Sequence, residues 1–160
     1  SSGSVIPKFI EQINNNKKIT ITDPTMTRFS ITMNQALDFI LKATQKGHGA
    51  EVFIPKLKAY SLQQIHDILS NLTNAKDHEI IGMRTGEKQH ELLINSDEMR
   101  DAWSYDNMFV LLNDLHESEN LEEVYPGIKK IEDLDVYSSA KTQQLSTEEI
   151  TENIKDLQLL

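Results

Sequence analysis

Residues 18–55, KITITDPTMTRFSITMNQALDFILKATQKGHGAEVFIP, decide the fold expected for this chain. Lys18 to Thr22 alternates β-branched residues, which predicts a short strand, and Asp23-Pro24 then turns the chain. The apolar spacing that follows predicts a helix over 33–46, and Glu51 to Ile54 predicts a buried strand. Strands and helices that alternate at this spacing favour an α/β fold.

Three capping boxes mark where helices should begin. Each places Ser or Thr before the first turn and Gln or Glu three residues later, so that two backbone N–H groups are satisfied reciprocally. The pairs are Thr32 with Gln35, Ser61 with Gln64, and Ser146 with Glu149. The second pair predicts a helix over 62–72, and the third predicts a last helix that carries Ile150, Ile154 and Leu157.

Further elements are expected on both sides of these helices. Apolar residues at i, i+3, i+4 and i+7 from Ile6 predict an amphipathic helix, with Pro7 tolerated in its first turn. Short strands are predicted at 79–82, 92–94 and 108–112, with a short helix after Ser96. Arg28 is then expected between a turn and a helix.

Composition divides the chain into three predicted parts. Residues 1–112 form the main α/β portion, residues 113–134 an acidic surface loop or insertion, and residues 135–160 a tail with a helix. The opening Ser1-Ser2-Gly3-Ser4 has no Met, which favours a fragment boundary.

The composition also excludes several classes of function. A net charge of -9 and a pI near 5.0 argue against nucleic acid as a partner, although one or two Arg side chains could still hold a small pyrophosphate. The absence of Cys removes disulfides and thiolate metal sites, and the scattered His residues suggest no metal site. No apolar run approaches the roughly 20 residues that span a bilayer, so we expect a cytoplasmic protein with no membrane partner.

Four ordered segments carry a resemblance to a known family. They are Gly3 to Pro7 (GSVIP), Ile19 to Phe29 (ITITDPTMTRF), Glu51 to Lys56 (EVFIPK) and Gly82 to Glu91 (GMRTGEKQHE). Together they resemble the C-terminal half of the CapD-like polysaccharide-biosynthesis family, nearest to its inverting UDP-N-acetylglucosamine 4,6-dehydratases. The resemblance covers 3–112 and resumes at 135–150, where Tyr137-Ser138-Ser139 matches the tail of the family.

The resemblance implies a division of labour within an extended short-chain dehydrogenase. A Rossmann portion, absent here, would hold NADP and the catalytic groups, while this α/β portion would close over the UDP-sugar. The isolated chain is then expected to be catalytically inert, and the complete enzyme to be a homo-oligomer. Ser2, Ser30 and Thr85 depart from the family pattern, which leaves sugar specificity open.

The resemblance assigns Arg28 and Arg84 to the UDP phosphates and Glu87 to the ribose hydroxyls. A guanidinium offers a planar fork of donors to a pyrophosphate, and a carboxylate can accept both hydroxyl protons of a ribose. The alternative for Arg28 is an ordinary ion pair with Asp23 or Asp38. The alternative for Arg84 and Glu87 is a solvated charged loop.

By the same resemblance, Val5, Ile6 and Pro7 would form the floor of the uracil pocket, and backbone groups around Thr20 and Thr22 would pair with the edge of the base. Core packing explains the apolar spacing of the first three residues equally well.

Catalytic groups are not expected in this chain. No Gly-rich fingerprint lies between a strand and a helix. Tyr125 with Lys129 and Tyr137 with Lys141 match a Tyr-x-x-x-Lys pattern formally, but the first pair contains Pro126-Gly127 and the second lies in the tail. His90 is expected to be a structural hydrogen-bonding residue.

Two other functions stay open. The same grip on UDP could serve a 4-epimerase or a retaining dehydratase, because binding motifs do not determine the chemistry. The chain could also be a non-catalytic module that binds a nucleotide sugar.

Overall fold

The computed structural model describes residues 5–73, 77–112 and 120–156. The helices are α1 (Val5–Asn14), α2 (Met33–Lys46), α3 (Leu62–Thr73), α4 (Leu121–Val124), α5 (Thr147–Asp156) and the 3-10 helix η1 (Glu98–Asp101). The strands are β1 (Ile19–Ile21), β2 (Thr27–Ser30), β3 (Val52–Pro55), β4 (Lys58–Ser61), β5 (His78–Ile80), β6 (Leu92–Ile94), β7 (Ala102–Tyr105), β8 (Met108–Leu111), β9 (Lys129–Lys130) and β10 (Tyr137–Ser138).

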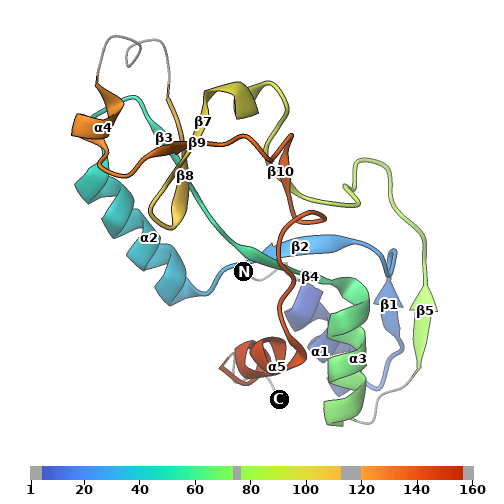
Figure 1. The fold of residues 1–160 in the computed structure, drawn as a ribbon. Helices are drawn as coiled ribbons and strands as arrows, with labels where there is room; N and C mark the ends of the chain where they lie inside the picture. Colours follow the sequence, from blue (N-terminus) through green and yellow to red (C-terminus); the bar gives the residue numbers. More distant parts are fainter. Residues whose placement is uncertain (1–4, 74–76, 113–119, 157–160) are drawn as a thin grey trace.

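The elements form two lobes that β2 and β4 join (Figure 1). One lobe contains α1, α3 and α5 with the parallel pair β1 and β5. The other contains α2, α4 and the antiparallel sheet of order β3-β8-β7-β9. Strands β2 and β4 pair antiparallel with each other, as do β6 and β10.

The α/β fold class is confirmed, but β1 and β3, the strands predicted on either side of α2, do not pair with each other. β1 pairs with β5, and β3 pairs with β8. Within the described residues, β1 and β5 are the only parallel pair, so most of the sheet structure is antiparallel.

The three capping boxes are confirmed. In each, the side chain of the first residue accepts from the backbone N–H three residues later, at 3.1–3.2 Å, and the return bond measures 2.8–2.9 Å. These bonds join residues three positions apart, so the local sequence was enough to predict them.

Helices α1, α3 and α5 bury their apolar faces in one core. Phe9 and Ile10 of α1, Ile65 and Leu69 of α3, and Ile150 and Ile154 of α5 meet there with Ile19 and Ile21 of β1. The tail thus packs against the beginning of the chain. Leu157, also predicted for the apolar face of the last helix, lies outside the described residues.

Some predictions differ from the structure. Strand β3 ends at Pro55 and buries only Ile54, while Val52 remains 54% exposed, because β3 lies at the edge of its sheet. Strands β2, β4, β7, β9 and β10 were not predicted.

The predicted acidic loop is also more ordered than its composition indicates. Residues 120–134 contain α4 and β9, and Tyr125 and Ile128 are buried in the same core as Tyr105 and Val110. The rest of the predicted loop, 113–119, lies outside the described residues. Leu121 and Val124 also pack against this core, so the apolar side chains within the acidic stretch hold it to the rest of the lobe.

None of the helices that the structure describes is both long and apolar enough to cross a membrane.

Candidate functional site

A cavity of about 430 Å³ lies between α1, β1, β2, β4 and the loop that follows β5. Its lining consists of Val5, Lys8, Phe9, Thr20, Thr22, Met26, Arg28, Phe29, Tyr60, Leu62, Glu87 and Glu91. Five of the eight residues predicted to bind the UDP-sugar are in this lining: Val5, Thr20, Thr22, Arg28 and Glu87. We call it the site cavity.

Hydrogen bonds between distant segments assemble the site cavity. The register of β2 and β4 places Arg28 opposite Tyr60. The loop after β5 is tied to β2 by the backbone bond from Thr27 N–H to the Gln89 carbonyl, 3.0 Å. These contacts bring the predicted ITITDPTMTRF and GMRTGEKQHE segments together although about 60 residues separate them.

Arg28 follows the Asp23-Pro24 turn and precedes α2, as predicted, but it lies within a strand, β2, that was not predicted. Its Nη1 donates to the carbonyls of Thr27 at 2.7 Å and Gln89 at 3.2 Å. Its Nε lies 4.0 Å from Oε1 of Glu91, and the side chain is 25% exposed. The alternative ion pair with Asp23 is not formed, because Asp23 accepts from the backbone and side chain of Thr25. Arg28 is thus held at the cavity with part of its guanidinium open to it.

Glu91 is a cavity residue that the sequence analysis did not assign. Its Oε2 accepts from the backbone N–H of Phe29 at 2.7 Å, and its own N–H donates to Oγ of Ser139 at 2.9 Å. It therefore connects β2 with the tail and faces Arg28. Its position inside the GMRTGEKQHE segment was the available signal.

Tyr60 is the second cavity residue that was missed. Burial raises its pKa to about 12, the negative charge of Glu91 adds to this effect, and Arg28 opposes it. The hydroxyl is protonated at neutral pH and can donate a hydrogen bond to an anionic ligand.

Glu87 lines the site cavity, but Arg84 does not. The two residues close a turn, in which Oε2 of Glu87 accepts from the Arg84 N–H at 3.0 Å and the Glu87 N–H donates to the Arg84 carbonyl at 3.1 Å. Gly86 has a φ of +87° in this turn, a conformation that glycine adopts readily. Arg84 itself is exposed.

The predicted floor of a uracil pocket is only partly assembled. Val5 lines the site cavity, whereas Ile6 packs against the core of its lobe and Pro7 lies in the first turn of α1. The Thr20 N–H, predicted to pair with a base, donates instead to Oε1 of Gln12 at 3.1 Å. The Gln12 amide also donates to Oγ1 of Thr20 at 2.7 Å. The Gln12 side chain therefore already occupies the Thr20 N–H and hydroxyl groups that a base would use. The Gly3-Ser4 part of the motif lies outside the described residues.

A network of buried hydroxyl groups joins β2 to His90 and to the tail, next to the site cavity. Oγ of Ser139 lies 2.7 Å from Oγ1 of Thr27, which lies 2.8 Å from Nδ1 of His90. Ser139 donates its single proton to the Thr27 carbonyl at 3.1 Å, so the Thr27 hydroxyl donates to Ser139 and accepts from His90. His90 thus forms a hydrogen bond within the protein, as predicted.

Neither Tyr-x-x-x-Lys pair lines the site cavity. Tyr125 is fully buried, and its hydroxyl donates to Glu51. The Tyr137 hydroxyl bonds with backbone groups of Pro55 and Leu57, while Lys141 pairs with Asp135 at 2.8 Å. Both tyrosines thus have hydrogen-bond partners within the protein.

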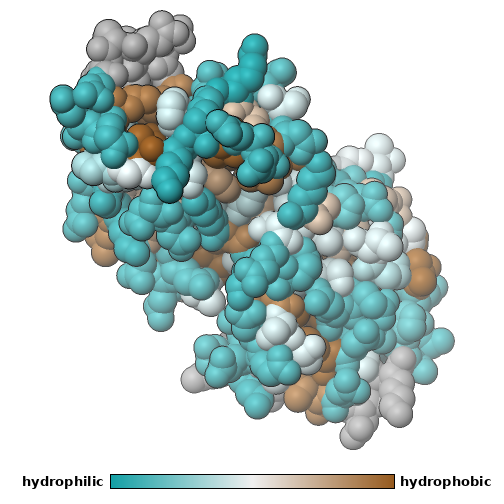
Figure 2. Space-filling model, viewed as in Figure 1, coloured by the Kyte–Doolittle hydropathy of each residue, from teal (hydrophilic) through white to brown (hydrophobic). Residues whose placement is uncertain are grey.

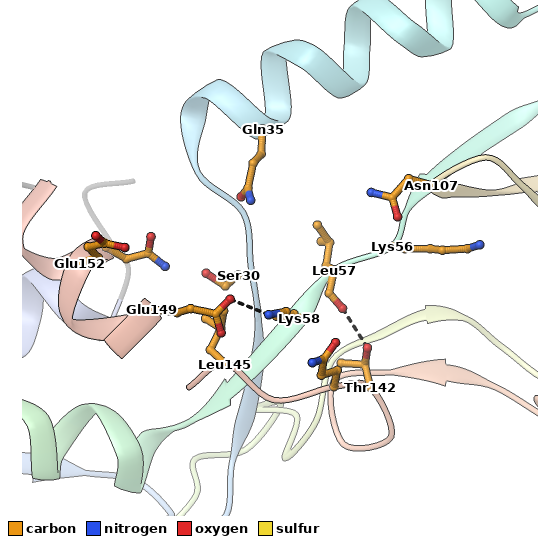
Figure 3. Close-up of a pocket in the computed structure, with 12 residues that line it drawn as sticks. Ser30, Gln35, Lys56, Leu57, Lys58, Asn107, Thr142, Leu145, Glu149 and Glu152 are labelled. Carbon is orange, nitrogen blue, oxygen red and sulfur yellow. Dashed lines mark hydrogen bonds and ion pairs between the residues drawn. The ribbon is translucent and has the colours of Figure 1, made fainter. Parts of the chain in front are cut away.

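A second cavity, of about 550 Å³, lies farther along β4 (Figure 3). Lys58 and Glu149 form an ion pair of 2.5 Å there, and the Thr142 hydroxyl donates to the Leu57 carbonyl at 2.8 Å. None of the predicted binding residues lines it.

The described residues do not fit a nicotinamide cofactor. A dinucleotide site needs a Gly-rich turn between a parallel strand and the N-terminus of a helix. β1 leads into the turn at Asp23-Pro24, and β5 leads into the loop 81–91, so neither is followed directly by a helix. No group of His, Asp or Glu side chains in the same ranges is placed to hold a metal ion.

Comparisons with known proteins show what this chain is similar to. A family model described as "Polysaccharide biosynthesis protein" matches residues 1–113. A relative named "UDP-glucose 4-epimerase" from Rickettsia bellii (strain OSU 85-389) is 37% identical over 158 residues, which are 98% of this chain and 46% of the relative. One with the same name from Rickettsia massiliae (strain Mtu5) is 35% identical over 153 residues, 95% of this chain and 45% of the relative.

A solved structure, "X-ray structure of Pen from Bacillus thuringiensis", shares the fold with a TM-score of 0.81. It is 34% identical and matches 99% of this chain but 47% of its own chain. The chain therefore spans about half the length of the relatives it matches.

Proposed function

Since the chain belongs to the polysaccharide biosynthesis protein family, we propose that it is the UDP-sugar-binding portion of an enzyme that modifies a nucleotide sugar. The substrate we propose is UDP-N-acetylglucosamine, and the reaction is an inverting 4,6-dehydration on the route to a surface polysaccharide or flagellin glycan. The reaction itself would belong to the complete enzyme.

The observation that carries this proposal is the composition of the site cavity. Residues from α1, β1, β2, β4 and the loop after β5 line one space of about 430 Å³, a size in the range of small-ligand sites. Arg28 and Lys8 supply positive charge, Glu87 a carboxylate, and Val5 and Phe9 an apolar wall. A nucleoside diphosphate needs these three kinds of surface.

Each group has a role in the proposed complex. The guanidinium of Arg28 would bind the diphosphate, and the protonated hydroxyl of Tyr60 would donate to it. The free oxygen of Glu87 would accept from the ribose hydroxyls, because its Oε2 is already bonded to the Arg84 N–H. Arg84 would reach the phosphates from the same loop only after a rearrangement of its exposed side chain.

The complete enzyme would use a nicotinamide cofactor, NADP in our proposal, held outside the residues described here. When bound, it would accept a hydride from C4 of the sugar and return it. The role of residues 5–156 is to bind the substrate, and we propose no proton or hydride transfer by their side chains. The purified 160-residue chain should therefore not turn over UDP-N-acetylglucosamine.

A 4-epimerase is the second candidate, favoured by the printed names of the Rickettsia relatives. Mass spectrometry of the product from a protein of the relatives' full length distinguishes the two reactions. Dehydration removes one water from the sugar, whereas epimerisation leaves the mass unchanged.

Binding is tested by isothermal titration calorimetry, in which UDP is titrated into the purified chain and the dissociation constant is measured. We expect Arg28→Ala to weaken UDP binding by about 10- to 100-fold, because a charge-assisted hydrogen bond contributes roughly 1.5–3 kcal/mol. Arg100→Ala is the matched control, since Arg100 lies on η1 and is not part of the cavity lining.

Equal UDP affinity in the Arg28→Ala and Arg100→Ala variants would contradict the proposed role of Arg28. Failure of the unsubstituted chain to bind UDP at millimolar concentration would contradict the assignment of the site cavity. Circular dichroism on each variant checks that the fold is retained.

A further inference from the structure

Arg28 has only part of its guanidinium available to a ligand. Nη1 donates to two backbone carbonyls, those of Thr27 at 2.7 Å and Gln89 at 3.2 Å. Nη2 has a weak contact with Sδ of Met26, at 3.9 Å. Nε and Nη2 lie on one edge of the guanidinium, and an anion can bind such an edge through two parallel hydrogen bonds. We call it the free edge of Arg28.

The carboxylate of Glu91 lies beside the free edge of Arg28. Its Oε1 is 4.0 Å from Nε of Arg28, while its Oε2 accepts from the Phe29 N–H at 2.7 Å. The backbone N–H of Glu91 donates to Oγ of Ser139, which is fully buried. Because both the backbone and the side chain of Glu91 are bonded to other segments, the carboxylate is held in this position.

The negative charge of Glu91 acts on any anion that binds at the free edge. A phosphate oxygen bound to Nε at about 2.9 Å would lie within about 7 Å of Oε1, since Oε1 and Nε are 4.0 Å apart. Salt at physiological concentration screens charges only over roughly 8 Å or more. Burial raises the pKa of Tyr60 to about 12 and Glu91 adds to this rise, so the same charge also acts on a second polar group of the site cavity.

The site cavity has no excess of positive charge to offset this repulsion. Among its lining residues, the cations Lys8 and Arg28 are balanced by the carboxylates Glu87 and Glu91. The chain has a net charge of -9, and Figure 2 shows mostly hydrophilic residues on the face seen there. The preference of the cavity for one anion over another therefore depends on the few charges of its own lining.

Nucleotides that share a uridine diphosphate differ in charge at the terminal phosphate. In a UDP-sugar this phosphate is esterified on both sides and carries one negative charge. In free UDP it is a monoester, which loses its second proton with a pKa of about 6 and carries two negative charges at about pH 8. Arg28 alone would bind the group of higher charge more tightly, whereas the adjacent Glu91 opposes this preference.

We propose that Glu91 determines nucleotide specificity at the free edge of Arg28: its fixed carboxylate disfavours a terminal phosphate with two charges and so favours a UDP-sugar over free UDP. The effect requires no contact between Glu91 and the sugar. It keeps free UDP from competing with the substrate for the site cavity. This inference rests on the proposed function, whose specificity it names.

Glu91→Gln tests the proposal, because the amide oxygen can still accept from the Phe29 N–H while the negative charge is removed. The dissociation constants of UDP, UDP-N-acetylglucosamine and inorganic pyrophosphate are measured by isothermal titration calorimetry at one slightly alkaline pH. Glu98→Gln is the matched control, since Glu98 also accepts from a backbone N–H, that of Asn95 at 2.9 Å, and does not line the site cavity. Glu91→Asp retains the charge and is the second variant.

We expect Glu91→Gln to tighten the binding of UDP about 3- to 10-fold more than that of UDP-N-acetylglucosamine, from one additional charge at about 6–7 Å in a partly exposed site. Binding of pyrophosphate should also become tighter. Glu98→Gln and Glu91→Asp should keep the ratio of the two nucleotide affinities that the unsubstituted chain has. Thermal unfolding of each variant verifies that it is folded.

Three results would overturn the proposal. The first is an unchanged affinity ratio in Glu91→Gln. The second is a change that comes only from weaker binding of UDP-N-acetylglucosamine, because Glu91 would then be a contact of the sugar. The third is a shift toward UDP in Glu91→Asp as large as in Glu91→Gln, because the charge would then not be the cause.

Failure of the proposed function gives a different result. If neither nucleotide binds to any of the chains, the proposed function is contradicted, and pyrophosphate alone decides the role of Glu91. Tighter pyrophosphate binding by Glu91→Gln than by the unsubstituted chain would then support a specificity role at the free edge of Arg28. Equal or absent pyrophosphate binding in the two chains would overturn that role as well.

Discussion

Replacing Ser139 by alanine should destabilise the protein more than its small change in volume suggests. Ser139 is fully buried, and its Oγ takes part in three hydrogen bonds: from the Glu91 N–H, with the Thr27 hydroxyl and to the Thr27 carbonyl. Each joins segments that are 48 or 112 residues apart. The Ser139 hydroxyl therefore closes the tail over β2 and the site cavity.

The magnitude follows from the groups that would lose their partner. The Glu91 N–H would lose its bond in a part-buried place, and an unsatisfied group of this kind costs roughly 1–3 kcal/mol. The Thr27 carbonyl would still accept from Nη1 of Arg28 at 2.7 Å. The Thr27 hydroxyl keeps His90 as a partner. We expect a loss of about 1–3 kcal/mol in the free energy of unfolding, equivalent to a Tm lower by about 2–12 °C in a protein of this size.

Urea unfolding followed by circular dichroism measures this loss. Ser138→Ala is the matched control, because it removes the same hydroxyl from the adjacent buried position outside the network. If Ser139→Ala loses less than about 0.5 kcal/mol, or no more than Ser138→Ala, the network does not stabilise the fold and the reasoning is wrong.

Two further perturbations test other parts of the structure. Burial favours a higher pKa for Glu51, but hydrogen bonds from the Tyr125 hydroxyl and the backbone N–H groups of His48 and Gly49 outweigh it and lower the pKa to about 2 from 4.5. This stabilisation, about 1 kcal/mol after allowance for solvent screening, is present above pH 4.5 and lost as the pH falls toward 2. The urea midpoint of Glu51→Gln should therefore change less over that range than that of the unsubstituted chain, and parallel curves would contradict this. Ile154→Ala should lower the free energy of unfolding by about 2–5 kcal/mol because Ile154 is fully buried, whereas exposed Glu152→Ala should change it little. If urea unfolding gives similar losses in the free energy of unfolding for the two substitutions, α5 does not pack in the core that it shares with α1 and α3.

Part of the site was predictable because its residues lie in quoted segments of the sequence. Arg28 and Glu87 were assigned from such segments, and both line the site cavity. Tyr60 and Glu91 were missed because neither has a local pattern that marks it. They face the cavity only because β4 pairs with β2 and because the Glu91 carboxylate reaches the Phe29 N–H. Gln12 was missed for the same reason.

The orientation of α2 shows the limit of periodicity. The apolar spacing behind Thr32 predicted the helix and its bounds correctly, but the structure leaves Met33, Leu37, Ile40 and Leu41 of its apolar face exposed. The spacing reports that the helix has an apolar face, and not what covers it.

The sequence by itself determined α2, α3 and α5 with their starting residues, the α/β class and the family. Capping bonds and helical hydrogen bonds join residues three or four positions apart, so the information lies in one short segment. Only the tertiary structure decided which strands pair, that the acidic stretch folds back through Tyr125, and which polar groups meet at the site cavity. Those bonds join residues up to 112 positions apart, and their partners are selected by the packing of the whole chain.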